Sequence, residues 1–84
     1  MRKDKPIVRV GLVNSKVTDA GLKKLAGLTQ LRELILFNTK VTDAGLKHLA
    51  GLKQLRVLFL VGTKVTGKGK TELKKALPNL VFIL

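Results

Sequence analysis

The side chains that perform acid–base, nucleophilic or metal chemistry are scarce in this 84-residue chain. There is one histidine and no cysteine, so a thiol nucleophile and a disulfide framework are excluded. The acidic residues are Asp4, Asp19, Glu33, Asp43 and Glu72. The histidine, His48, aligns with Lys24 in an earlier and very similar segment of the chain, which indicates a solvent-facing position. No nucleophile, base and orienting group come together, and no metal-ligand spacing occurs, so we expect neither an enzyme nor a cofactor or metal site.

Basic residues are far more abundant, with 17 lysines and arginines against five acids and a formal net charge of +12. Some of them recur at a constant interval, so that they should align in rows: Lys16, Lys40 and Lys64 in one, Arg32 and Arg56 in another. Such rows can contact phosphates, which makes binding of a polyanion such as nucleic acid one alternative. The charges are scattered over several faces and no tyrosine or tryptophan lies among them, which favours a solvated surface.

These positions recur because nearly the whole chain is one repeated unit. Residues 17–40 and 41–64 are full units of equal length, identical at 18 of the 24 aligned positions. Residues 7–16 match the second half of the unit, residues 65–84 are a diverged last copy, and residues 1–6 form a basic arm. A period in the 20s predicts a repeat architecture, here a single domain over residues 7–84. The near-identity of the units fits an engineered minimal repeat scaffold as well as a recent natural duplication.

Each unit carries the spacing L-x-x-L-x-L followed five residues later by Val. It is formed by Leu31, Leu34, Leu36 and Val41, by Leu55, Leu58, Leu60 and Val65, and by Ile7, Val10, Leu12 and Val17. This spacing, with the segment V-T-D-A-G-L, resembles the short bacterial type of leucine-rich repeat. The resemblance implies a short α/β solenoid with four parallel strands on its concave side and about three helices on its convex side. It also implies binding to other proteins, although a fold does not by itself define a function. Parallel strands joined by helices should form a right-handed coil.

Strands are expected at about residues 7–12, 31–36, 55–60 and 80–84, joined by helices. The first helix should begin at Asp19 or the next residue, with Thr18 or Asp19 as N-cap, and end at Gly27 in a left-handed conformation. The second unit should repeat this. The last helix is expected to begin later, capped by Thr71 or a neighbour, and to end at Pro78.

Side chains alternate between the two faces of a strand, so outward-facing rows can be assigned. We predict the rows Arg9, Glu33, Val57 and Phe82; Gly11, Ile35, Phe59 and Leu84; and Val13, Phe37 and Val61. All three phenylalanines would then lie on the concave face. So much exposed apolar surface usually marks a binding site. The predicted protein-binding residues are Ile35, Phe37, Val57, Phe59, Val61, Phe82 and Leu84. The alternative is that these side chains only pack against one another along the sheet.

The last strand, at residues 80–84, is apolar and would offer an unprotected edge for pairing with a second copy. We therefore predict a non-catalytic protein-interaction or self-associating scaffold, with a homodimer as one outcome. No signal-like segment and no apolar run long enough for a membrane span occurs, so a cytoplasmic location is expected.

Overall fold

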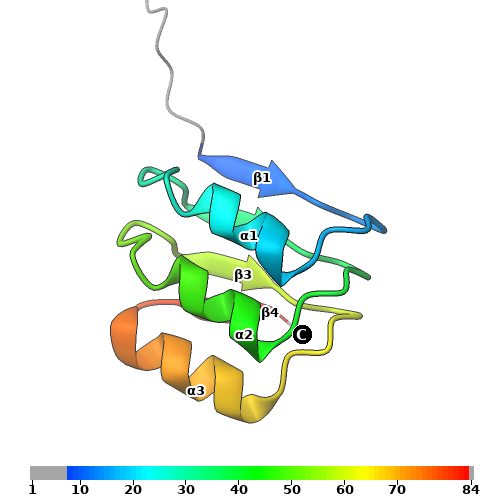
Figure 1. The fold of residues 1–84 in the computed structure, drawn as a ribbon. Coiled ribbons are helices and arrows are strands. Elements are labelled where there is room, and N and C mark those ends of the chain that lie inside the picture. Colours follow the sequence, from blue (N-terminus) through cyan, green and yellow to red (C-terminus); the bar gives the residue numbers. More distant parts are fainter. Residues whose placement is uncertain (1–7, 84) are drawn as a thin grey trace, which may run out of the picture.

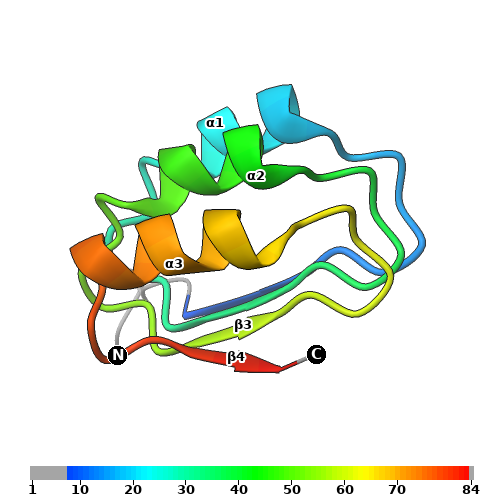
Figure 2. The ribbon, with the colours of Figure 1, turned by 90° about the horizontal axis from the view of Figure 1, so that it is seen from below.

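A computed structural model describes residues 8–83 as an α/β fold with a four-stranded parallel sheet and three α-helices. The strands lie side by side in chain order and are β1 (Arg9–Gly11), β2 (Glu33–Ile35), β3 (Val57–Phe59) and β4 (Val81–Ile83). The helices are α1 (Asp19–Leu25), α2 (Asp43–Leu46) with the 3-10 turn η1 (Lys47–Leu49), and α3 (Gly67–Ala76). They alternate with the strands and lie on one side of the sheet (Figures 1 and 2). The basic arm, Ile7 and Leu84 lie outside the described residues.

The core fills the space between the helices and the sheet and consists almost entirely of leucine. Its members are buried to 4% exposure or less: Leu22, Leu31, Leu34, Leu36, Val41, Leu46, Leu49, Leu52, Leu55, Leu58, Leu60, Leu73, Leu77 and Leu80. The middle residue of β2 and of β3 is buried and its two neighbours are half-buried, as alternation along a strand requires. The predicted parallel strands and helices are thus confirmed, and the inward side chains come from the predicted leucine spacing.

Each strand pairs with the next at an offset of one full unit, which corrects one predicted row. Val57 pairs with Val81 and Leu58 pairs with Phe82, so Phe82 belongs to the inward row rather than the outward one. Leu80 is buried like Leu55. One residue separates Leu80 from the inward residue Phe82, whereas two residues separate Leu55 from the inward residue Leu58. A shift of one residue exchanges the two faces of a strand, so the outward residues of β4 are Val81 and Ile83.

Turns after the strands use left-handed backbone at one equivalent position in each unit. Asn14 and Asn38 have φ values of 53° and 54°, and Gly62 follows with 78°. Within residues 8–83, Gly62 is the one glycine with positive φ, so the predicted left-handed stop at Gly27 is wrong. Helix α1 instead ends through Ala26, whose φ is −61°. The hydroxyl of Thr39 donates to the Leu36 carbonyl at 3.1 Å and closes the turn from inside.

Neighbouring units are joined by an aspartate that reaches across to the next threonine. Asp19 accepts hydrogen bonds from the backbone N–H of Thr42 at 2.7 Å and from its hydroxyl at 2.6 Å. Asp43 accepts the same two bonds from Thr66. This contact positions the threonine immediately before the helix, so α3 begins at Gly67 and the predicted later start near Thr71 is wrong.

Close approach of the preceding unit's aspartate explains why the V-T-D-A-G segment ends in glycine. A methyl group added at Gly45 would overlap the Asp19 carboxylate and lie 3.1 Å from the Asp19 Cα. Gly69 stands in the same relation to Asp43. In the last unit Gly67 replaces the aspartate, at the place where the described residues include no further unit to bind. Thr18 and Thr42 occupy the predicted N-cap positions, and the Thr42 hydroxyl accepts from the Ala44 N–H at 3.3 Å, whereas Thr18 forms no side-chain cap and Asp19 bonds to the next unit.

Candidate functional site

The side of the sheet opposite the helices carries a continuous apolar surface. We define the outer sheet face as Val13, Ile35, Phe37, Val57, Phe59, Val61, Val81 and Ile83. No described element covers this side of the sheet (Figure 2). Val61, Val81 and Ile83 are 44%, 51% and 39% exposed, and Ile35, Val57 and the two phenylalanines are half-buried. The face is therefore accessible to a partner along all its length.

Two aromatic rings form the centre of the outer sheet face. Phe37 and Phe59 contact each other edge to face, with ring centroids 5.7 Å apart and planes at 87°. This arrangement is favourable for an aromatic pair. The predicted lateral packing is thus present, yet both rings remain partly exposed. The pair holds two large apolar side chains in fixed positions, which suits them as anchors in an interface.

The structure brings together five of the seven predicted protein-binding residues: Ile35, Phe37, Val57, Phe59 and Val61. Phe82 lies on the other side of the sheet, and Leu84 lies outside the described residues. Val81 and Ile83 were missed as members of the face. A strict offset of one unit from Val57 and Phe59 would have identified both, because the strand register follows that offset.

The N-terminal end of the same face is polar. The Arg9 Nε donates to the Glu33 carboxylate at 2.6 Å, between β1 and β2. Because Gly11 is the neighbouring outward residue of β1, the apolar surface begins at β2 and extends to β4. The outer sheet face thus has a charged margin at one end and apolar side chains over the rest.

The predicted rows of basic residues are exposed but separate from one another. They are Lys16, Lys40 and Lys64 in the turns that lead to the helices, and Arg32 and Arg56 immediately before β2 and β3. In the described part of the chain, no carboxylate lies within ion-pair distance of any of the five. The two rows lie at opposite ends of the strands and do not form one patch. They place positive charge at the two ends of the strands.

The edge of β4 is less open than predicted. Lys74 of α3 donates from its Nζ to the Leu80 carbonyl at 2.6 Å, immediately before the strand. A lysine at a strand edge disfavours pairing with another chain. The contact covers only the Leu80 carbonyl, immediately before the strand, so self-association through the edge of β4 stays a prediction.

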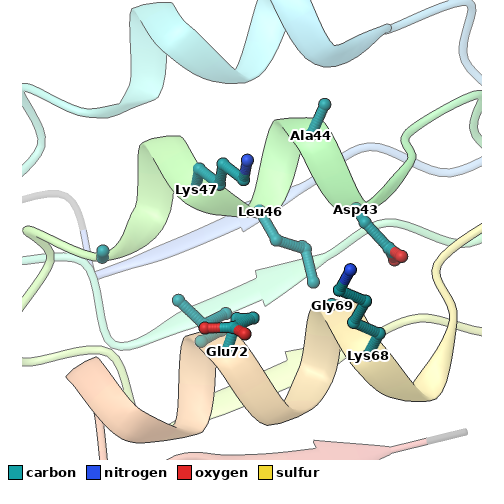
Figure 3. Close-up of a pocket in the computed structure, with 9 residues that line it drawn as sticks. Asp43, Ala44, Leu46, Lys47, Lys68, Gly69 and Glu72 are labelled. Atoms are coloured by element: carbon teal, nitrogen blue, oxygen red, sulfur yellow. The ribbon is translucent and has the colours of Figure 1, made fainter.

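A groove of about 620 Å³ runs between α2 and α3 on the helical side (Figure 3). Leu46 and Leu73 form its apolar floor, and Lys47, Lys68 and Glu72 stand around its rim. Asp43 also lines it, and hydrogen bonds from the hydroxyl and the backbone of Thr66, aided by nearby Lys68, hold its pKa below the ordinary value. A carboxylate that is already bonded in this way is a poor proton acceptor.

Side chains that could bind a metal or transfer a proton are sparse in residues 8–83. No cluster of three or more potential metal ligands occurs in that range. The lone histidine, His48, lies in η1 and is half-buried rather than solvent-facing as predicted. No helix in the described part of the chain has the length and apolar character to cross a bilayer. Comparison of the chain with protein-family models, with curated proteins and with solved structures finds no match.

Proposed function

We propose that this chain is a short right-handed solenoid of the leucine-rich repeat type and acts as a non-catalytic module that binds another protein. The repeat assignment rests on three in-register copies of the L-x-x-L-x-L spacing and on strands that each pair with the equivalent strand of the next unit. The threonines at the position usually held by asparagine bond the turn backbone: Thr63 donates to the Leu60 carbonyl at 2.8 Å.

The observation that carries the binding function is the uncovered outer sheet face with the Phe37–Phe59 pair at its centre. Apolar side chains on one side of a sheet normally pack against a second layer. Here the second layer covers the other side, and the outer face has none among the described elements (Figure 2). A partner protein is the layer that would bury it.

The size and charge of this face favour a different protein over a second copy. Three strands about 4.8 Å apart, with about five residues of each, give an apolar patch on the order of 250 Å². A stable interface needs about 800 Å² from each side, so a partner must also contact the rims. Those rims carry Arg32, Arg56 and the lysine row. A second copy would oppose them with like charges, whereas a partner with an apolar centre and an acidic periphery would complement them.

The test places a photo-crosslinking phenylalanine analogue at position 59 and, as a control, at the exposed position 24 on α1. Any protein that crosslinks only through position 59 is purified, and its affinity is measured for the wild type and for Phe37→Ser/Phe59→Ser. We expect a loss of at least tenfold, because removing anchor side chains costs about 2 kcal/mol or more. Unchanged affinity in the double variant would refute the proposal.

Polyanion binding is the second candidate, favoured by the exposure of the two basic rows. The double variant Lys40→Glu/Lys64→Glu distinguishes polyanion binding from protein binding. This change should abolish salt-dependent binding to nucleic acid and leave a contact through the phenylalanine pair largely intact. Wild-type protein that binds no nucleic acid at low salt would eliminate this candidate.

A further inference from the structure

The C-terminal end of the stack differs chemically from every internal level. Helix α3 and strand β4 lie at the end opposite β1 (Figure 1). Between them is a shallow hollow of about 350 Å³, lined by Lys70, Thr71, Lys74, Lys75 and Phe82. We call this the end hollow. It lies on the inward side of β4, away from the outer sheet face, so it is a separate surface from the proposed binding face.

Two residues in the end hollow occupy positions that are buried leucines in the internal units. Leu34 and Leu58 are fully buried in the row that continues to Phe82, but Phe82 is only half-buried. Lys70 takes the place that the buried Leu46 holds in the preceding unit, and is itself half-buried. The aliphatic part of a lysine can cover an apolar surface while its ammonium group stays in water. The end hollow thus has an aromatic floor and a cationic rim.

Coverage of the leucine core explains polar residues on an outer surface of the last described unit. It does not explain an aromatic ring left partly open or charges of a single sign in the lining. Three of the five lining residues are lysines and none is acidic. Glu72 reaches Lys75 only at 4.0 Å, and both side chains are largely exposed. Lys74 bonds to a neutral carbonyl, so its charge is not compensated by that contact.

The edge of β4 also offers backbone N–H and C=O groups for hydrogen bonding. The Val81 N–H donates to the Arg56 carbonyl and the Ile83 carbonyl accepts from the Leu60 N–H, so both residues point their backbone groups at β3. Successive residues of a strand direct these groups to opposite sides. The N–H and C=O of Phe82, between them, therefore point to the open edge, beside the end hollow.

We propose that the end hollow binds an acidic polypeptide segment. An apolar side chain of the segment packs on Phe82, its carboxylates meet Lys70 and Lys75, and its backbone bonds to the free groups of Phe82. A second copy does not fit, because end-to-end contact would place the same lysines against each other in a protein of net charge +12. Free backbone donors and acceptors at a strand edge favour a polypeptide over a nucleic acid.

The test uses a fluorescein-labelled peptide of alternating glutamate and valine, with anisotropy as the readout, and a lysine–valine peptide as the negative probe. Binding is compared between wild type, Lys70→Glu/Lys75→Glu and the matched control Lys23→Glu/Lys24→Glu, which makes the same charge change on α1. We expect the end-hollow pair to weaken binding at least tenfold and the α1 pair less than about twofold, because exposed charges beyond a Debye length are screened. Phe82→Ser should also weaken binding, and Phe82→Leu should restore most of it.

Should Lys70→Glu/Lys75→Glu fail to fold by circular dichroism, the neutral pair Lys70→Gln/Lys75→Gln serves in its place. Equal weakening by the two charge-reversed pairs, or no wild-type binding at low salt, overturns the proposal. So does tighter binding of an oligothymidylate of equal charge that shows the same dependence on Lys70 and Lys75. The Phe37→Ser/Phe59→Ser variant should bind the acidic peptide normally, so that failure here is distinguishable from failure of the proposed function.

Discussion

Removing the Asp19 carboxylate tests whether polar contacts as well as the leucine core hold neighbouring units together. In the folded protein both carboxylate oxygens accept hydrogen bonds from Thr42, at 2.7 and 2.6 Å. Bonds to a charged group contribute about 1.5–3 kcal/mol each, and water replaces part of this at a half-exposed site. Asp19→Ala should therefore lower the free energy of unfolding by about 2–3 kcal/mol. An 84-residue domain has roughly 4–13 kcal/mol in all, so the loss is large.

The assay is urea unfolding followed by circular dichroism, together with a thermal melt. The expected loss corresponds to a fall in the melting temperature of roughly 10–20 °C for a domain of this size. Asp19→Asn keeps one acceptor oxygen and should cost less than Asp19→Ala. A double-mutant cycle with Thr42→Val should give a coupling of about 1 kcal/mol, because the valine removes only the hydroxyl. A loss below about 0.5 kcal/mol, or strict additivity in the cycle, would refute the role of this contact.

Three further outcomes follow from the described contacts. Gly45→Ala should destabilise the fold by about 1–3 kcal/mol because its methyl group would overlap the preceding unit's aspartate, whereas Gly51→Ala, with open space around it, should be neutral in the same urea melts. The pKa of Asp43 lies below its ordinary value of 3.8, so the carboxylate stabilises the fold above pH 3.8 and loses this contribution as the pH falls through the lower folded-state pKa. Asp43→Asn should flatten this part of the acid unfolding curve. Lys74→Ala removes the donor at the edge of β4 and should raise the tendency to self-associate, measured by light scattering.

The repeat itself could be predicted because its signals agree at several levels. The repeat period, the leucine spacing and the turn residues all indicate the same strand–helix unit, and the sheet register follows that period. Consistent signals of this kind are what make a sequence interpretable. The outer sheet face was predicted in the two full units for the same reason, since alternation follows directly once the strands are located.

The two predictions that moved an element or a strand face were wrong in the last unit, where local pattern and long-range pairing disagree. Alignment of Leu80 with Leu55 is correct for the core but places the following strand one residue out of register, and that displacement moved Phe82 to the wrong face. The start of α3 was missed because it is positioned by Asp43 of the preceding unit, a long-range contact that no local capping rule describes. One signal was present in the sequence: the aspartate is missing only in the last unit, where Gly67 stands in its place.

The central claim is that the outer sheet face binds a different protein and not a second copy of the chain. Its most direct test is the mass of the protein in solution, measured by light scattering after size exclusion over a range of concentration and salt. We predict a monomer of 9.2 kDa throughout, because a second copy would oppose like charges around a small apolar patch. A mass of twice this value that persists at high salt and returns to the monomer in Phe37→Ser/Phe59→Ser would contradict it. In that case the outer sheet face is buried against a second copy of the chain.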